Sequence, residues 1–371
     1  ETVYHMTKEG DKVLFKHYHN EGLIKKPAIE NGNVKISGEP SVGWLFEDTA
    51  LDIGFKWYDA GKVMGLAQYK GYEKELSFQW IEFVDLANRM QKKSQEMASN
   101  LIRKYADKTG IKNIVITGGY GLNCVANYYY LDKLKDLNIY IDPICFDSGV
   151  SLGAAYYHHL KSGSDLKPLD NIYMMSNNHE IDLTDTDNKD VSYDDIVDLL
   201  IDGNIVSMFQ GQAECGQRSL GNRTLLFDPR VKDGKDIVNR IKKRESFRPF
   251  AGTVLLEHAN EWFDMRGLKE SPYMLYAMQC LDGVRDKIPS IVHADNTCRI
   301  QTVTKEQNLH LYNIIECFYK RTGIPILLNT SLNLAGDPLV ETFDDALDTL
   351  ERSELNCLYL PELSKLIQHR C

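Results

Sequence analysis

The sequence lacks a long apolar segment, paired cysteines and an excess of positive charge. No apolar run reaches the roughly 18 residues of a membrane-spanning helix, which predicts a soluble protein without membrane contacts. The eight cysteines form no CxxC pair and no dense cluster, which favours reduced thiols and a cytoplasmic location. The chain has 43 Lys and Arg and 53 Asp and Glu, which gives a net charge of −10. This charge argues against a broad binding surface for nucleic acid or anionic lipid.

The sequence also lacks an initiator methionine and the apolar core of a signal peptide, since it opens at Glu1 with a charged run. We therefore expect the chain to begin inside a longer protein. Its 371 residues exceed what one compact core usually sustains, which predicts two domains. The fractions of apolar residues (43%) and charged residues (26%) are typical of globular proteins.

The first half of the sequence alternates helical and strand patterns. Apolar residues recur three and four apart from Trp80 to Gly110, which predicts an amphipathic helix with a glycine C-cap. The apolar run Ile114–Ile116 then ends at a glycine pair, which predicts a buried parallel strand, a tight turn and a helix near Cys124. A second strand is predicted at 138–146. This rhythm is typical of an α/β domain.

A polar, acidic stretch at 161–190 marks the predicted domain boundary, so we predict domains at 1–178 and 190–371. The second domain also reads as α/β. Its predicted helices cover 191–203, 233–245 and 341–353, and its predicted strands cover 204–211 and 322–333.

Three glycine-rich turns in the first domain are candidates for phosphate contacts. The turn from Thr117 to Asn123 can bring backbone N–H groups close to an anion, but it can equally be a tight strand-to-helix turn. Asp147, at a strand end before small residues, suits either a metal ligand or a helix N-cap. Lys62 lies in a third glycine-bounded loop and is either a phosphate contact or a solvated lysine.

An arginine-rich stretch in the second domain predicts a local anion site. From Arg218 to Arg248 there are ten cations against four acids, although the protein as a whole is acidic. The planar fork of arginine suits phosphate or carboxylate, and the glycines and proline between these arginines are not typical of a merely solvated face. A loop between predicted strands carries His293 and Arg299, and the end of a predicted strand carries Asn329, but each alone is compatible with a packed or surface residue.

Taken together and in order, eight segments resemble the carbamoyltransferase family that includes antibiotic O-carbamoyltransferases and nodulation-factor carbamoyltransferases. The agreement covers nearly the whole chain. The segments are VGWLFEDTALDIGFKWYDAGKVMGLAQY, ITGGYGLNCVAN, FDSGVSLGAA, GQAECGQRSLGNRTLLFDPR, KKRESFRPFAGTV, SPYM, HADNTCRIQTV and TGIPILLNTSLNLAGDPLVET.

The resemblance implies a partial TsaD-like domain of the actin-like ATPase superfamily, followed by a YrdC-like α/β domain. In this family the YrdC-like domain converts carbamoyl phosphate and ATP to carbamoyl-adenylate. The TsaD-like domain then passes the carbamoyl group to a hydroxyl of a small-molecule acceptor. ATP and a divalent metal, Fe or Mg, are the implied cofactors.

The same resemblance assigns residues to these roles by motif. In the second domain it implies a catalytic set of Arg218, Lys243, Arg248, His293 and Arg299, and carbamoyl phosphate and adenylate contacts from Asn329, Ser331 and Asn333. In the first domain it implies nucleotide contacts from Lys62, Gly65, Gly118, Gly119, Asn123, Ser148 and Gly149, with Asp147 as the metal ligand. Pre-positioned cations and amide donors suit a reaction in which charge shifts onto a leaving phosphate or pyrophosphate.

The sequence departs from the family pattern at its start. Family members usually begin with a segment holding an HHxxHA-like motif and a DGxG turn, which His5, His17 and His19 do not reproduce. We therefore expect the histidine ligands of the metal from an N-terminal segment outside this sequence, as a separate chain or an omitted part. Gln217 also replaces a usual proline, and Tyr120-Gly121 a usual valine-alanine.

Two alternatives to a small-molecule carbamoyltransferase remain. One is the related threonylcarbamoyl-adenosine machinery of tRNA modification, against which the negative net charge argues. The other is a non-catalytic structural subunit, against which the retained arginine and asparagine loops argue. The sequence does not identify the acceptor, the metal or the oligomeric state.

Overall fold

The computed structural model describes residues 2–7, 10–16, 27–30, 33–36, 41–165, 167, 169, 171–175 and 181–368. The chain divides by contacts into two compact units, Glu1–Tyr140 and Ile141–Cys371. The predicted domain ranges of 1–178 and 190–371 stay a prediction. None of the helices in the described ranges combines the length and the apolarity that crossing a membrane requires.

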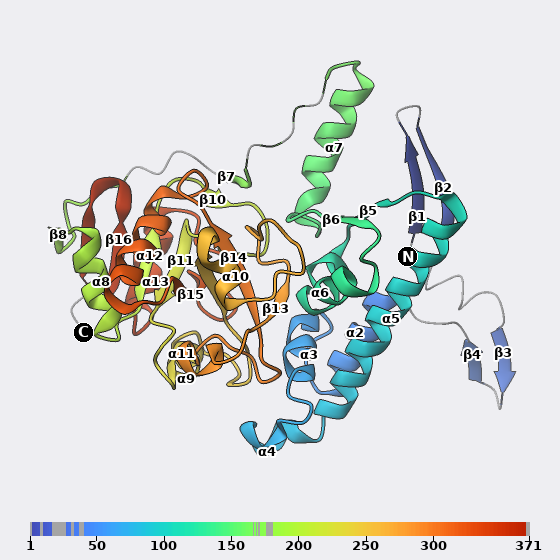
Figure 1. Ribbon diagram of the computed structural model, residues 1–371, viewed down its shortest axis with the longest axis horizontal. Helices are drawn as coiled ribbons and strands as arrows, with labels where there is room; N and C mark the ends of the chain where they lie inside the picture. The colour runs from blue at the N-terminus through green and yellow to red at the C-terminus, as the bar shows by residue number, and fades with distance from the viewer. Residues whose placement is uncertain are drawn as a thin grey trace. The chain divides into compact units, whose positions relative to one another are not determined.

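The first unit is built around the 26-residue helix α5 (Val84–Thr109), which α2, α3 and α6 contact (Figure 1). The C-cap Gly110 has φ 72° and donates its N–H to the Ala106 carbonyl at 2.8 Å, so the predicted amphipathic helix and its glycine cap are confirmed. The unit's elements are β1 (Thr2–Thr7), β2 (Gly10–Lys16), β3 (Pro27–Glu30), β4 (Asn33–Ile36), α2 (Val42–Asp52), α3 (Ala60–Ala67), η1 (Glu73–Glu75), α4 (Phe78–Ile81), η2 (Gly119–Leu122) and α6 (Cys124–Lys133).

The predicted strand at 114–116 is present as β5 (Asn113–Ile116), which pairs with β6 (Asn138–Ile141) in a two-stranded sheet. The expectation that it is fully buried is wrong. Exposed and half-buried residues alternate along β5, and Val115 is 63% exposed. A strand of this kind has one covered face and one uncovered face, so its unbroken apolar run does not report burial on both sides.

The second unit holds a large mixed sheet and the helices that cover it. Its elements are α7 (Ser148–Lys161), β7 (Tyr173–Met175), β8 (Asn188–Asp190), α8 (Tyr193–Ile201), β9 (Val206–Phe209), β10 (Ala213–Glu214), β11 (Arg223–Phe227), α9 (Gly234–Ile241), β12 (Ala251–Leu255), η3 (Leu256–His258), α10 (Ala259–Trp262), β13 (Ala277–Gln279), α11 (Val284–Lys287), β14 (Thr297–Val303), α12 (Leu309–Thr322), β15 (Ile326–Ser331), α13 (Phe343–Glu351), β16 (Cys357–Leu360), η4 (Pro361–Leu363) and β17 (Lys365–Gln368).

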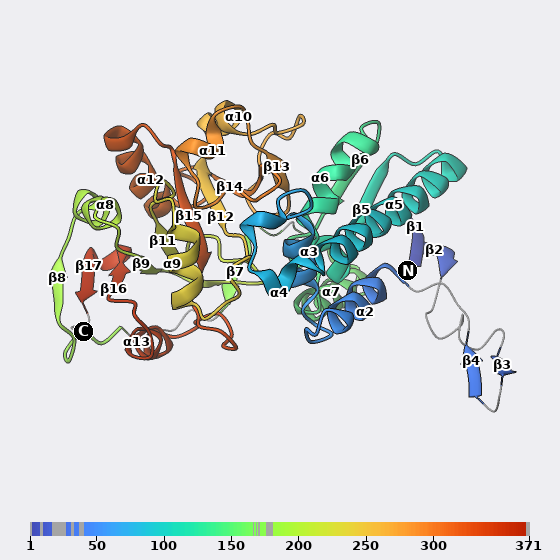
Figure 2. The same ribbon diagram turned by 90° about the horizontal axis from the view of Figure 1, so that it is seen from below.

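Nine described strands form the sheet in the order β13-β14-β12-β15-β11-β9-β16-β17-β8. The β12–β14 and β9–β16 pairs are parallel, whereas β15 is antiparallel to both of its neighbours, β11 and β12. Every residue of β9, β11 and β12 is buried, because helices cover both faces of the sheet. In Figure 2, α8 and α12 lie on one side of the row of strands and α13 lies on the other. The α/β prediction is confirmed for this unit.

The predicted elements of the second unit agree with the structure to within a few residues. Helix α8 begins at a capping box between Ser192 and Asp195, and α13 begins at another between Thr342 and Asp345. The predicted strand at 322–333 is β15, whose residues are buried except at its end. Strand β7 pairs with β10, so residues 173–175, which lie within the predicted boundary stretch of 161–190, pair with this unit.

Candidate anion-binding site

Lys242 is a buried lysine directed at the end of β15. It follows α9, is 0% exposed, and its Nζ donates to the carbonyl oxygen of Ser331. The same Nζ lies 2.9 Å from both the carbonyl oxygen and the Oδ1 of Asn333. Ser331 Oγ in turn donates to Asn333 Oδ1 at 2.7 Å. The ammonium group therefore fixes the turn that carries Ser331 and Asn333, two of the predicted ligand contacts.

The motif assignment named Lys243, which the structure places in a different environment. Lys243 is exposed, and its backbone adopts φ 49°, in the left-handed region that ends many helices. Arg244 then turns back, with its N–H donating to the Asn239 carbonyl at 2.8 Å. Helical periodicity could have identified the buried lysine, because Lys242 lies four residues after the fully buried Val238. The catalytic role of Lys243 stays a prediction.

Three guanidinium groups gather near this lysine. Burial, together with the charges of Arg248 and Arg299, lowers the pKa of Arg244 to about 9. Burial likewise lowers the pKa of Lys242, with added repulsion from Arg244 and Arg248. Each of these cations therefore lies within range of the charge of at least one other, and we call Lys242, Arg244, Arg248 and Arg299 the cation cluster. Sequence reasoning did not assign Arg244 to the site.

The strand β14 and the end of α9 hold these groups in place. We expected Arg299 in a loop, but it lies within β14 and pairs with Ala251 of β12 and Ala277 of β13. The loop that carries Arg248 is held by Asn239 Nδ2, which donates to the carbonyl of Arg248 at 3.0 Å. The cluster is therefore mounted on regular structure rather than on an unsupported loop.

Within the described part of the chain, the cation cluster has little negative charge beside it. Glu245 Oε2 lies 3.8 Å from Arg248 Nη1. The buried Arg299 Nε has no hydrogen-bond acceptor among the described residues. Cations that are buried or half-buried together are costly unless negative charge compensates them. The arrangement is therefore suited to binding a multiply charged anion such as a phosphate ester.

His293 lies in the turn before β14 and is 5% exposed. Its Nε2 lies 3.2 Å from the Phe250 carbonyl, and its Nδ1 lies 3.1 Å from the Thr297 hydroxyl. Burial lowers the pKa of His293 to about 4, against the opposing charge of Asp295. The imidazole is therefore neutral at neutral pH. Because the carbonyl can only accept, this geometry assigns the proton to Nε2.

Asn329 belongs to a buried polar network at the centre of the sheet. Its Nδ2 donates to Thr253 Oγ1 at 2.9 Å and to Gln301 Oε1 at 3.0 Å, and its Oδ1 accepts from Thr224 Oγ1 at 3.3 Å. These residues lie on four adjacent strands, β15, β12, β14 and β11. The amide of Asn329 is 0% exposed and fully engaged, so in this structure it braces the strands under the site. Its ligand contact stays a prediction.

The arginine-rich loop between β10 and β11 divides into a half-buried Arg218 and a structural Arg223. The Arg223 guanidinium donates to four carbonyl oxygens, those of Gln210, Gly211, Asn222 and Glu341, and is 0% exposed. Arg218 lies near Cys145, because its charge opposes the rise that burial causes in the pKa of that thiol. Arg230, beyond the loop, pairs with the buried carboxylate of Asp228 at 2.6 Å.

The predicted nucleotide contacts of the first unit serve local structure. Asn123 caps α6 by accepting from the Ala126 N–H at 3.0 Å, and it exchanges two amide hydrogen bonds with Gln91. Lys62 lies in helix α3 and not in the predicted loop, and it pairs with Asp59 at 3.1 Å. Gly118 has φ 87°, which only glycine adopts readily, at the start of η2, where Gly119 follows. Gly65 is buried within α3. Their nucleotide contacts stay predictions.

Asp147 precedes the first residue of α7 and is exposed, and its side chain makes no capping hydrogen bond. Ser148 and Gly149 form the first turn of this helix. At Gly149 an added Cβ would lie 2.0 Å from the Ile144 carbonyl oxygen, so the backbone of the preceding turn requires glycine here. The nucleotide contacts of Ser148 and Gly149 stay predictions.

Of the predicted metal ligands, the described residues contain Asp147. Among the described residues, no three His, Cys, Asp or Glu side chains come together as a metal site would require. His5 lies on β1, whereas His17 and His19 lie outside the described residues. Asp147 alone does not make a metal site, so no step through a metal is derived from these residues. The seven described cysteines are free thiols, and Cys371 lies outside the described residues.

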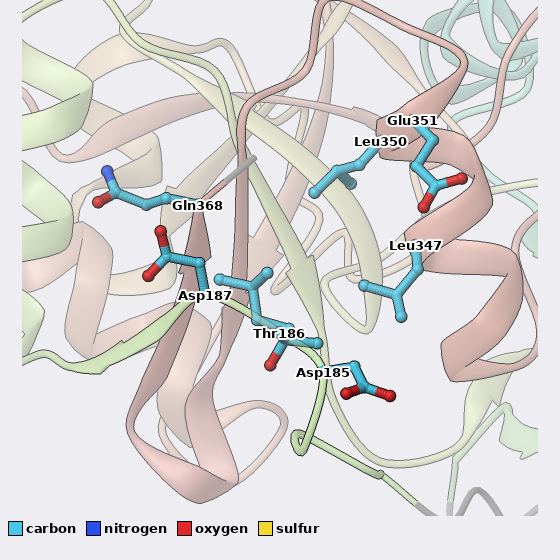
Figure 3. A pocket seen from close by; sticks show the side chains of 8 residues that line it. Asp185, Thr186, Asp187, Leu347, Leu350, Glu351 and Gln368 are labelled. Carbon is cyan, nitrogen blue, oxygen red and sulfur yellow. The ribbon is translucent and has the colours of Figure 1, made fainter. Parts of the chain in front are cut away.

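A cavity of about 590 Å³ lies at the other end of the sheet, beside β17 and α13 (Figure 3). Leu347 and Leu350 project from α13 towards Thr186. Its lining includes three carboxylates, those of Asp185, Asp187 and Glu351, and the described residues contribute no cation to it. Negative lining repels phosphate groups, so the cavity does not suit the ligand that the cation cluster suits.

Two family models match the chain in order. The model described as carbamoyltransferase N-terminus matches residues 84–156, and the model described as carbamoyltransferase C-terminus matches residues 197–365. The C-terminal match includes every residue of the cation cluster. The N-terminal match includes Gly118, Gly119, Asn123 and the first turn of α7 with Asp147.

Curated relatives show the same likeness. Nodulation protein NolNO of Sinorhizobium fredii is 30% identical over 86% of this chain and 54% of its own length. Nodulation protein NolO of Bradyrhizobium diazoefficiens is 29% identical over 86% of this chain and 67% of its own length. The 3'-hydroxymethylcephem-O-carbamoyltransferase of Amycolatopsis lactamdurans is 28% identical over 62% of this chain and 44% of its own length. The chain thus spans about half the length of NolNO.

Among solved structures, full-length HypF in its phosphate- and nucleotide-bound form covers 50% of this chain and 24% of its own, with 15% identity and a TM-score of 0.30. Two proteins at that TM-score need not share a fold. The assignment to a family rests instead on the two family models, which match in order, and on relatives that align over most of the chain. On these matches the chain belongs to the carbamoyltransferase family.

Proposed function

We propose that the second unit binds carbamoyl phosphate and ATP at the cation cluster and forms carbamoyl-adenylate, as a YrdC-like domain. The single observation that carries this proposal is the gathering of Lys242, Arg244, Arg248 and Arg299, with Arg299 Nε buried and without an acceptor among the described residues. Both substrates carry phosphate groups, and the family of the chain supplies the carbamoyl chemistry.

The reaction balances with one water. Carbamoyl phosphate, ATP and water give carbamoyl-adenylate, phosphate and pyrophosphate, so two phosphorus-containing anions leave the site. The arginines of the cluster stabilise the negative charge that develops on these leaving groups, which is the largest contribution that fixed cations make to such transfers. Ser331 and Asn333, held by Lys242, supply neutral hydrogen-bonding groups at the edge of the same site.

Arg218 and His293 complete the proposed site. His293 is neutral and can act only as a hydrogen-bonding or proton-accepting group near neutral pH. Ser219, which follows Arg218, donates to the Arg223 carbonyl and shares a hydrogen bond with Thr224, which donates to Asn329. The loop of Arg218 is therefore tied to strands that support the site. Arg218 adds a further cation for the second phosphate group.

We propose carbamoyl transfer as the function of the TsaD-like part of the protein, with a hydroxyl of a small molecule as acceptor. The turn at Gly118-Gly119 and the start of α7 are the proposed nucleotide contacts. A divalent metal, Fe or Mg, would polarise the carbamoyl carbonyl, with Asp147 as one ligand and histidines supplied from outside this sequence. The proposed location is the cytoplasm, where ATP is available.

The proposal is tested by measuring pyrophosphate released from ATP, with and without carbamoyl phosphate. The wild-type chain should release pyrophosphate only when carbamoyl phosphate is present. Arg299→Met should lower this rate by at least about 100-fold, because a positioned cation contributes about 3 kcal/mol or more to such a step.

Arg240→Met is the matched control, since Arg240 is an exposed arginine of the same unit that pairs with the exposed Glu354. Its rate should equal that of the wild type. Pyrophosphate release that does not depend on carbamoyl phosphate, or an Arg299→Met variant as active as Arg240→Met, would contradict the proposal.

A further inference from the structure

Glu214 is a buried carboxylate at the foot of the loop that carries Arg218. It ends β10, is 3% exposed, and burial raises its pKa. Its Oε1 accepts the backbone N–H groups of Leu220 at 2.6 Å, Asn222 at 2.8 Å and Arg223 at 3.4 Å. One oxygen atom thus gathers three successive parts of the loop around itself. Neither composition nor family motif singled out this residue.

The remaining groups of the loop are also engaged. The Leu220 carbonyl accepts from Tyr173 Oη at 3.0 Å and from Gln301 Nε2 at 2.8 Å, and the Gly221 carbonyl accepts from Gln210 Nε2 at 2.9 Å. Gly221 has φ 120°, and an added Cβ would lie 2.7 Å from Leu311, so the loop turns where only glycine fits. Residues 219–223 therefore form a rigid support immediately after Arg218.

The charge of Glu214 is balanced through the same loop. The carboxylate stabilises the charge of the buried Arg223, opposing the fall that burial causes in the pKa of that guanidinium to about 10. Glu214 Oε2 is buried and has no hydrogen-bond partner among the described residues. Burying a carboxylate to hold a loop through three N–H groups is energetically unfavourable unless other interactions offset the desolvation of the charge.

We propose that Glu214 is a positioning residue, which fixes the loop 215–222 so that Arg218 meets the phosphate groups of the substrate. It touches no substrate itself and acts through Arg218. This inference rests on the proposed function of the cation cluster. It assigns to Glu214 a role in anion affinity, in addition to its role in holding the fold of the loop.

A double-mutant cycle with Arg218 separates this role from general stability. The affinity of the full chain for pyrophosphate is measured by calorimetry for the wild type, Glu214→Ala, Arg218→Met and the double variant. Glu214→Ala should weaken binding about tenfold in the wild-type background, because the three N–H groups lose their acceptor. In the Arg218→Met background the same change should weaken binding by less than about twofold.

Glu214→Gln keeps the proposal testable if the alanine variant fails to fold. Its amide oxygen still accepts the N–H groups, so most of the affinity should return, to within about threefold of the wild type. Asp228→Asn is the control, because Asp228 is another buried carboxylate that pairs with Arg230 at the opposite end of β11. Its affinity for pyrophosphate should be unchanged even if its unfolding temperature falls.

The outcomes distinguish the two proposals. A wild-type chain that does not bind pyrophosphate would overturn the proposed function, and this inference with it. Wild-type binding with equal effects of Glu214→Ala in both backgrounds would overturn this inference alone. An effect of Asp228→Asn as large as that of Glu214→Ala would do the same, because it would show that affinity follows stability rather than the loop.

Discussion

At the scale of single residues, the site depends on which side chains are buried with their charge. Lys242 gives its hydrogen bonds to Ser331 and Asn333, whereas its neighbour Lys243 points into solvent. The two lysines are identical in chemistry and adjacent in sequence. The turn of the backbone at Lys243, directly after α9, is the reason that only Lys242 is directed into the site.

The two lysines therefore form a matched pair of variants. Lys242→Met should weaken pyrophosphate binding by about 30-fold, because hydrogen bonds to a charged group contribute about 2 kcal/mol. Lys243→Met should change it by less than about twofold, as expected of an exposed side chain. Calorimetric titration of both folded variants measures the difference. A larger loss of pyrophosphate affinity in Lys243→Met than in Lys242→Met would show that Lys243, which the motif assignment named, is the lysine of the site.

His293 predicts how stability depends on pH. Its pKa in the folded protein, about 4, lies below the ordinary value of 6.5, so the unfolded chain takes up a proton at a higher pH than the folded chain. Stability is therefore fully present above about pH 6.5 and falls as the pH drops towards 4, by on the order of 3 kcal/mol.

Urea unfolding of the wild type and of His293→Gln between pH 7 and pH 4 tests this dependence. The wild type should lose more stability over this range than His293→Gln does. His158→Gln, at an exposed histidine on α7, should keep the wild-type dependence. Parallel curves for the wild type and His293→Gln would show that His293 does not carry the effect.

Residue chemistry was only partly predictable from the sequence. The window from Arg218 to Arg248 correctly signalled a local excess of cations, but composition does not distinguish a ligand-facing arginine from Arg223, whose guanidinium binds four backbone carbonyls. Glu214 and Arg244 were not assigned, because the role of a single acid or arginine depends on its burial. That burial is set by strands distant in the sequence.

At the scale of elements, local signals were reliable where they act locally. Helix α5 ends at Gly110, and α8 and α13 begin at capping boxes, because caps depend on neighbouring residues only. The apolar run of β5 did not report its exposure, since the burial of a strand depends on what packs over it. Arg299 was expected in a loop for the same reason, because the length of β14 is set by its partners β12 and β13.

Helix α7 offers a test with its own control. Gly149→Ala should lower the free energy of unfolding by about 1–3 kcal/mol, because its Cβ would meet the Ile144 carbonyl oxygen at 2.0 Å and the backbone must shift. Gly153→Ala, in the same helix with nothing within 4 Å of the added Cβ, should instead stabilise the protein by about 0.5–1 kcal/mol. Urea unfolding of both variants decides. Equal effects would show that the close approach at Gly149 is relieved without cost.

At the scale of the whole molecule, the protein combines a net charge of −10 with a concentrated group of cations in the second unit. A negative net charge repels large polyanions. A local cluster of cations still attracts small phosphate compounds, because its charge acts over about one Debye length, roughly 8 Å at physiological salt. The proposed substrates, carbamoyl phosphate and ATP, are small phosphorylated compounds of the kind that this charge distribution suits. Among the described residues, the acidic cavity beside α13 does not share this property.

The most direct test of the account is a calorimetric titration of carbamoyl phosphate into the full chain, the Arg244→Met variant and the Arg240→Met control. We expect one binding event in the wild type and in Arg240→Met, and an affinity at least about tenfold weaker in Arg244→Met, because the cluster loses a buried cation that faces the phosphate. No binding by the wild type, or equal affinities for Arg244→Met and Arg240→Met, would contradict the assignment of the cation cluster as the carbamoyl phosphate site.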